Sequence, residues 1–175
     1  MHRLKIYKLL ASLLAFLFVF SPAIAKTKTI AADKVKGHLS VMVLGSGGPV
    51  STATNGRASS SYLFFIDGKP KILLDAGGGS YKTLVQSGVN IADLEIILLT
   101  HLHVDHTADM AAFIKGIFFH NRAKRKLRSL PIRIFGPGES KATFPKSAIT
   151  QYPSTDYYVE QLFNRKTGIE RYLHI

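Results

Sequence analysis

The sequence predicts a mixed α/β fold (α+β), with helices flanking a mixed sheet. Apolar runs of strand length end at glycine or polar turns, and between the later runs apolar residues recur at helical spacing. The chain has 175 residues, of which 46% are apolar and 19% charged, as expected for one globular domain. The expected strands are 39–44, 62–66, 71–74, 96–99 and 132–135, and the expected helices are 80–87, 107–118 and 155–164.

The N-terminal segment has the composition of a secretory signal. Three basic residues precede the apolar run 9–20, and the small-residue sequence Ala23-Ile24-Ala25 follows. We therefore expect residues 1–25 to be removed and the domain 26–175 to be periplasmic or secreted. An uncleaved anchor helix is the alternative, although the run is shorter than the roughly 20 residues that span a bilayer. The chain has no cysteine, which excludes a disulfide framework.

The chain is strongly basic. Its formal charge is +12, and removal of the signal leaves 20 basic and 11 acidic residues, a formal +9. Such a field raises the local concentration of anionic substrates, nucleic acid or acidic lipid. Basic residues are densest at 122–128, where a solvated loop is the simpler interpretation. A docking surface for phosphates or an anionic membrane is the alternative.

Turn sequences separate the first three expected strands. Gly45-Ser46-Gly47-Gly48-Pro49 lacks the last glycine of a G-x-G-x-x-G phosphate loop, because Val50 stands there. A tight turn is therefore the simpler interpretation. Asp67-Gly68 is typical of a hairpin turn.

The third strand leads into a helix through a glycine-rich segment. Asp75 follows the strand, the glycines 77–79 come next, and helix 80–87 is closed by Gly88. Consecutive glycines are needed where the backbone passes another group closely. Asp75 could cap the helix that follows.

The stretch Thr100-His101-Leu102-His103-Val104-Asp105-His106 follows the buried strand 96–99 and indicates a metal site. Imidazole nitrogen and carboxylate oxygen are ligands that Zn²⁺ prefers. In a turning segment His101 and His103 point the same way and can share one ion. Asp105 and His106 could hold a second ion, as in two-metal hydrolytic sites. A polar loop that caps the next helix is the alternative.

The segment after this stretch has a helical apolar stripe: Met110, Phe113, Ile114, Ile117 and Phe118. We expect this helix to begin beside His106, so that Asp105 lies at the positive end of its dipole. His120 is expected on the surface.

The motif Thr-His-x-His-x-Asp-His after an apolar strand resembles the signature of the metallo-β-lactamase superfamily. The segments 43–49, 57–61 and 73–77 are similar to the ribonuclease Z-like branch and its secreted hydrolase relatives, and the likeness extends over 39–173. The resemblance implies an αββα sandwich, of which this chain supplies the first half and the start of the second. Residues 26–175 are therefore expected to be a C-terminally incomplete domain.

The resemblance also implies site roles. Two Zn²⁺ ions would be bound by His101, His103, Asp105 and His106. Asp105 would also be catalytic. Asp75 would lie behind the ligands and orient one of them. An ion-bound hydroxide would attack a phosphodiester, sulfate ester or related ester. The later ligands of the family have no match here, and His174 is the only histidine left downstream.

The ligand count limits the expected activity. Two ligands for each ion fall short of the three that zinc sites use, so weak zinc binding and little or no turnover are expected.

The expected partner is a small-molecule or anionic ester substrate, with nucleic acid less favoured. A sheet face left wet would favour aggregation or a homodimer. The alternative function is a non-catalytic fragment, or a basic module that binds anions or nucleic acid.

Overall fold

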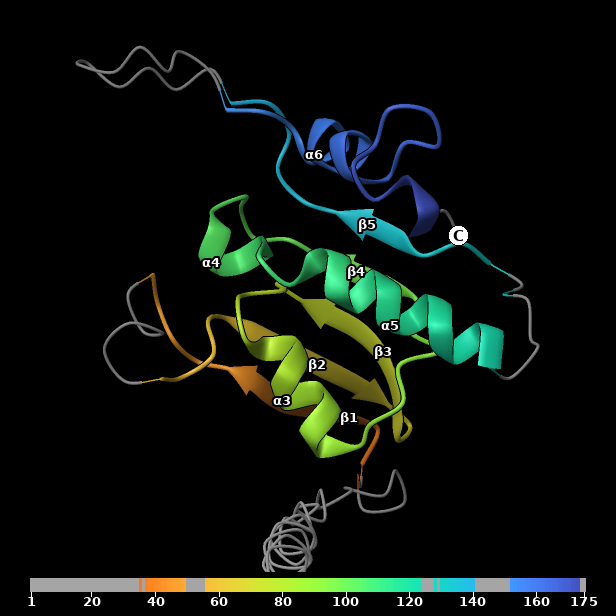
Figure 1. Ribbon diagram of the computed structural model, residues 1–175. Helices are drawn as coiled ribbons and strands as arrows, with labels where there is room; N and C mark the ends of the chain where they lie inside the picture. Colours follow the sequence, from red (N-terminus) through yellow and green to blue (C-terminus); the bar gives the residue numbers. More distant parts are fainter. Residues whose placement is uncertain are drawn as a thin grey trace, which may run out of the picture.

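One five-stranded sheet organises the part of the chain that the computed structural model describes: residues 35, 37–49, 56–123, 128, 130–140 and 152–173. The sheet has the order β1-β2-β3-β4-β5 (Figure 1). The elements are β1 (Leu39–Gly45), β2 (Ser61–Ile66), β3 (Lys69–Leu74), α3 (Ser80–Ser87), β4 (Ile96–Leu98), α4 (Val104–Thr107), α5 (Met110–Ala123), β5 (Arg133–Phe135), α6 (Thr155–Phe163) and the 3-10 helix η2 (Arg171–Leu173). The predicted mixed α/β fold is confirmed.

The sheet changes from antiparallel to parallel at β3. β1, β2 and β3 form an antiparallel meander, and the predicted hairpin turn joins β2 to β3. β4 and β5 then add in parallel, which requires helical crossovers through α3 and through α4 and α5. Because β3 and β4 are parallel and Leu74 pairs with Leu98, the loops after these two strands leave the same edge of the sheet.

The hydrophobic core lies between one face of the sheet and the helices α3 and α5. Leu63, Leu73 and Ile97 point from adjacent strands into this layer and are fully buried. Phe113 of α5 is also fully buried, and its ring meets that of Tyr81 edge to face at a centroid distance of 5.4 Å. This packing fixes the two helices against the sheet.

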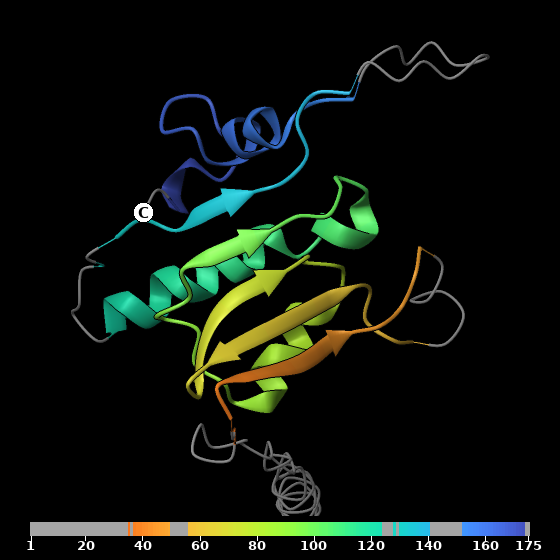
Figure 2. The same ribbon diagram turned by 180° about the vertical axis from the view of Figure 1, so that it is seen from behind.

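Among the described residues, no helix or second sheet covers the opposite face of β1, β2 and β3. Seen from behind, β1, β2 and β3 carry no described helix (Figure 2). The β1 residues on this face, Leu39, Val41 and Val43, are 64%, 50% and 54% exposed. The described residues thus form a helical layer and one sheet, and the second sheet of the expected sandwich is not among them.

Helix boundaries follow the local sequence signals in two cases. α3 spans the predicted residues and ends at Gly88, which has φ 72° as a left-handed cap. α6 begins after Ser154, whose side chain accepts a hydrogen bond from the Tyr157 amide. The predicted helix 107–118 is wrong at its start, because α4 and α5 are separate helices. The Asp109 amide donates to Ala76 O instead of continuing α4.

Among the described residues, no helix is both long and apolar enough to cross a membrane. The predicted signal, residues 1–25, lies outside the described residues.

Candidate metal centre

The candidate metal centre is built on the two loops that leave the sheet after β3 and β4. Asp75 begins the first loop, and its amide donates to Leu98 O at 2.8 Å, which joins the loops at their start. The second loop carries the histidine-rich stretch into α4. The two apolar strands therefore bring Asp75 and that stretch to one edge of the sheet.

Three groups with metal-binding atoms gather at this edge. His101, His103 and Asp105 each offer one ligand atom, and these atoms all lie within 4.8 Å of one another. The rings of His101 and His103 meet edge to face, with centroids 4.6 Å apart. Two imidazoles and one carboxylate form a donor set that catalytic zinc sites use, so the residues present fit this ion.

Asp105 lies between the other groups of the site. From the sequence, Asp105 was expected to bind an ion together with His106, with two ligands for each ion. The structure brings Asp105 together with His101 and His103, and its Oδ2 also lies 3.4 Å from His106 Nε2. Three groups therefore converge at one place, one more than the sequence argument counted for a single ion.

Asp75 connects the two loops through its carboxylate. It is only 2% exposed, and its Oδ1 accepts a hydrogen bond from the Thr100 amide at 2.8 Å. Its Oδ2 lies 2.7 Å from His106 Nδ1 and accepts from Thr100 Oγ1 at 2.9 Å. With Nδ1 donating to Asp75, the Nε2 atom of His106 is left facing Asp105. The orienting role expected of Asp75 thus has a geometric basis.

The alternative role for Asp75, capping helix α3, is wrong. The N-cap of α3 is Gly79, and no side chain makes a cap hydrogen bond there. The Asp75 carboxylate is instead directed across to Thr100 and His106. Its backbone has φ 58°, a left-handed conformation that aspartate tolerates better than most residues. This conformation ends β3 and turns the side chain toward the neighbouring loop.

The glycines after Asp75 differ in the space around them and in backbone conformation. A Cβ on Gly77 would overlap the Asp105 backbone carbonyl and would lie 2.7 Å from the Ser59 backbone. Gly79 has φ 85°, which favours glycine, whereas a Cβ on Gly78 would meet only the Ala108 Cβ at 3.6 Å. The expected close approach of the backbone is therefore made at Gly77.

The predicted relation of Asp105 to the long helix is wrong. Asp105 and His106 lie inside α4, a four-residue helix, and α5 begins only at Met110. α4 is held by backbone bonds to the first loop, in which the Ala76 amide donates to His106 O at 2.7 Å. The position of Asp105 therefore depends on the loop after β3 and not on the dipole of α5.

His101 is the member of the cluster whose pKa is shifted clearly. Burial lowers the pKa of its imidazole, and the neighbouring His106 and His103 lower it further. The ring is therefore neutral down to a lower pH than an isolated histidine. Neutral imidazole is the form that binds metal ions.

Two residues of the site were missed by the sequence argument. Thr100 was quoted in the motif without a role, yet it donates to Asp75 through both its amide and its hydroxyl. Tyr158 of α6 was given no role, yet its hydroxyl donates to Thr107 O at the end of α4. The sequence signal for Thr100 was its place directly after an apolar strand, as Asp75 directly follows another. We find no sequence signal for the contact of Tyr158.

The glycine-rich segment after β1 is not the tight turn expected, because its described residues continue the strand direction: Gly45 ends β1 and Gly47 forms a parallel bridge with Ser59. The Gly47 amide donates to Ala58 O and is therefore already used within the protein. A Cβ on Gly45 would overlap the Ser59 backbone oxygen. Val50 lies outside the described residues.

Arg128 of the basic segment is bound to the protein itself. Its guanidinium donates to Ala92 O and Leu94 O, both at 2.5 Å, and burial lowers its pKa. This arginine is therefore not a free cation of a docking surface, which was the alternative interpretation of 122–128. Residues 124–127 lie outside the described residues, as does His174.

His120 is half-buried and is not the surface residue expected.

The family of the chain is defined by a profile described as "Metallo-beta-lactamase superfamily", which matches residues 54–153. These residues contain both loops of the candidate metal centre and more than half of the chain. The chain belongs to the metallo-β-lactamase superfamily, a class of metal-dependent hydrolases.

Curated relatives with similarity to the chain include several proteins named ribonuclease Z. The chain is 28% identical to "Ribonuclease Z" of Metallosphaera sedula over 122 residues, which cover 70% of this chain and 38% of that protein. It is 31% identical to "Ribonuclease Z" of Methanopyrus kandleri over 101 residues, covering 57% of this chain and 32% of that protein. The chain thus spans about a third of the length of these relatives.

Solved structures with similarity to the chain include the short form of human tRNase Z. It is 28% identical, with a TM-score of 0.44 over 55% of this chain and 33% of that chain. The metallo-beta-lactamase fold protein YhfI from Bacillus subtilis is also 28% identical, with a TM-score of 0.41 over 56% of this chain and 36% of that chain.

Proposed function

We propose that this protein is a metal-dependent hydrolase of phosphodiesters, with zinc held by His101, His103 and Asp105. The observation that carries the proposal is the gathering of their ligand atoms within 4.8 Å at one edge of the sheet. The ribonuclease Z relatives, whose name denotes cleavage of a phosphodiester backbone, support this substrate class. The formal charge of +12 favours an anionic substrate.

Each residue of the site has its own role in the proposed reaction. When bound, zinc acidifies a water and polarises an ester oxygen. His101 and His103 supply neutral nitrogen ligands, and the Asp105 carboxylate is placed to orient the attacking water or accept its proton. Asp75 holds His106 through the 2.7 Å contact at Nδ1, so that Nε2 faces Asp105. We propose that His106 and Asp105 hold a second zinc ion on this side.

The substrate test separates small esters from RNA. We favour a small anionic phosphodiester over a sulfate ester, and RNA is the second candidate because the relatives are named ribonuclease Z. The full chain would be assayed with bis-p-nitrophenyl phosphate, p-nitrophenyl sulfate and a structured RNA. Hydrolysis of the sulfate ester alone would contradict the phosphodiester assignment.

The metal test uses a ligand variant and a matched control. His103→Ala is expected to lower the zinc content of the full chain and to remove whatever phosphodiester turnover the parental chain has, which the ligand count expects to be low. His38→Ala removes a histidine that lies outside the centre and pairs with Asp67, so zinc content and turnover should stay at the parental level. Metal analysis beside the assays gives both readouts. Unchanged zinc content in His103→Ala would contradict the site. Zinc binding without turnover would favour a non-catalytic metal- or anion-binding module.

We also propose that the protein is exported and that the mature chain begins at Lys26. The support is the basic, apolar and small-residue order of residues 1–25. Mass spectrometry of the protein from the periplasm of an expressing bacterium should give this terminus. An intact Met1 in the membrane fraction would instead indicate an anchor helix.

A further inference from the structure

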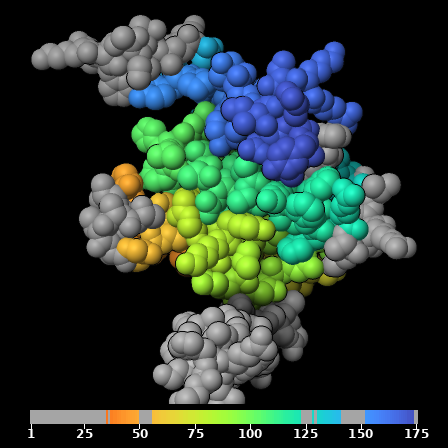
Figure 3. All heavy atoms as spheres, in the orientation of Figure 1, coloured from red at the N-terminus to blue at the C-terminus, as the bar shows by residue number. Residues whose placement is uncertain are grey.

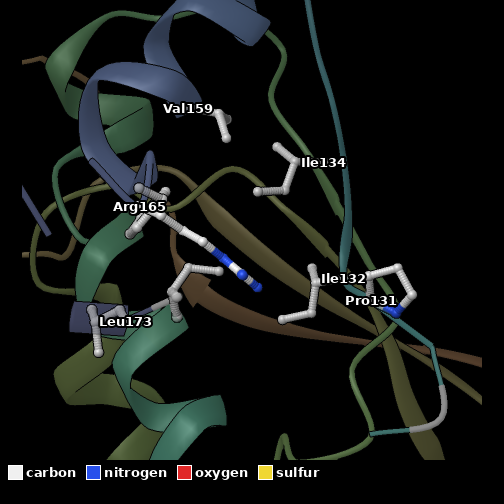
Figure 4. Close-up of a pocket in the computed structure, with 8 residues that line it drawn as sticks. Pro131, Ile132, Ile134, Val159, Arg165 and Leu173 are labelled. Carbon is white, nitrogen blue, oxygen red and sulfur yellow. The ribbon is translucent and has the colours of Figure 1, made fainter. Parts of the chain in front are cut away.

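A pocket of about 200 Å³ lies between α5, β5, α6 and η2 (Figure 4). In the space-filling view the α6 and η2 segment, in blue, packs over the green-to-cyan part of the chain (Figure 3). The pocket residues are Ile114, Pro131, Ile132, Ile134, Val159, Phe163, Arg165 and Leu173. Apart from one arginine, this lining is entirely apolar.

The pocket is separate from the candidate metal centre. Pro131 and Ile132 precede β5, whereas the metal-binding residues follow the C-terminal ends of strands parallel to it. The two sites therefore lie toward opposite edges of the sheet. No residue lining the pocket belongs to the metal centre.

Arg165 is the polar group of this pocket. Arg165 follows the end of α6 and is exposed, and its side chain extends over the pocket toward Ile132 (Figure 4). Among the described residues no ion pair to Arg165 is formed, whereas Arg133 of β5 lies 3.9 Å from a Glu95 carboxylate oxygen. A guanidinium always carries its charge and presents a donor pair that matches a carboxylate. The pocket thus offers one cation and an apolar wall.

We infer that this pocket binds a small monocarboxylate with a short apolar tail. The carboxylate would pair with Arg165, and the tail would pack on the isoleucine side chains of β5 and α5. The volume of about 200 Å³ has room for a short aliphatic chain. We take hexanoate, a six-carbon monocarboxylate, as the probe. Burial of the tail supplies affinity, and the ion pair supplies selectivity for anions.

The first test compares ligands that differ in one property each. Hexanoate would be titrated into the full chain and followed by amide chemical shifts, with hexanol, hexylamine and acetate as comparisons. We expect hexanoate to bind at least tenfold more tightly than each of the others, with shifts at Ile132 and Ile134. Equal binding of hexanol would overturn the role of the cation. Equal binding of acetate would overturn the role of the apolar wall.

The second test compares two cation variants of the same turn. Arg165→Gln should weaken hexanoate binding at least tenfold, because the charge at the pocket is lost. Lys166→Gln removes a neighbouring exposed cation that does not line the pocket, and should change binding less than twofold. Thermal unfolding of both variants would verify that they fold. Unchanged binding in a folded Arg165→Gln variant would overturn the proposal, as would absence of hexanoate binding to the parental chain.

Discussion

At Gly77 the main chain of the first loop passes against the backbone of α4, with no room for a side chain. Gly77→Ala is expected to lower the free energy of unfolding by about 1 to 3 kcal/mol, the range found for overpacked positions. The added methyl group would push Asp105 away from the histidines, so zinc content should fall as well. Urea unfolding and metal analysis measure the two effects.

The matched control is Gly78→Ala in the same loop. Its Cβ would make only ordinary contact with Ala108, so the free energy of unfolding should change by less than about 0.5 kcal/mol. If both variants lose stability equally, the effect comes from loop flexibility and not from contact with α4.

Thr100 holds Asp75 through its hydroxyl as well as its amide. Thr100→Val keeps the shape and the amide bond but removes the hydroxyl, leaving the buried carboxylate with one donor fewer. We expect zinc affinity to fall by about 10- to 100-fold, as for other residues that orient metal ligands without touching the metal. Competition titration with a chelator measures this affinity. Thr83→Val, which loses an exposed hydroxyl bond of 3.4 Å, should leave the affinity unchanged.

The sequence predicted which residues meet at this site better than it predicted how they bond. The common edge for Asp75 and His106 followed from two apolar strands, because parallel strands end at one edge. The grouping of Asp105 with His101 and His103 could not be predicted, because it depends on where α4 begins. That position is set by backbone bonds between distant segments, such as Ala76 to His106.

At the scale of elements, α6 is joined to α4 by one hydrogen bond from the Tyr158 hydroxyl to Thr107 O. Tyr158→Phe keeps the ring in place but removes this hydrogen bond. The free energy of unfolding should fall by about 1 kcal/mol. Hydrogen exchange should become faster at the α4 amides while those of α5 keep their rates.

The control for this variant is Tyr157→Phe, whose side chain is 58% exposed on the same helix. It should leave both the stability and the exchange rates unchanged. A uniform acceleration of exchange across α4 and α5 in Tyr158→Phe would contradict a local connection between the two helices.

The sequence predicted elements well where local signals end them. Ser80–Ser87 is closed by a left-handed glycine, and Thr155–Phe163 begins at a serine cap, so both helices have the expected bounds within one residue. The segment 107–118 has a continuous apolar stripe that gives no sign of a break. The break arises because the Asp109 amide bonds to Ala76 O, 33 residues earlier in the chain. A long-range bond of this kind leaves no local pattern.

At the scale of the whole molecule, the face of the sheet that no described helix covers predicts self-association. Leu39, Val41 and Val43 are at least half exposed, and their neighbours on β2 continue the apolar surface. The purified 175-residue chain should form dimers or larger species in a concentration-dependent manner. Val41→Lys should shift the population toward monomer, because a lysine on an edge strand opposes pairing.

The control is Val85→Lys, which places the same charge on α3 at an equally exposed position on the helical side. It should leave the association unchanged. Light scattering on a sizing column gives the mass of each species. A monomeric parental chain at high concentration would contradict this prediction.

The pairing of Leu74 with Leu98 aligns Asp75 with Thr100. A slip of β4 by one residue would turn Ile97 out of the core and would also carry Thr100 and the histidines away from the carboxylate. Misaligned chains are therefore both unstable and unable to assemble the ligand set. On the proposed zinc site, we expect zinc to be retained only by molecules in which β4 has the native register, so the zinc content after purification would measure correct folding without an enzymatic assay.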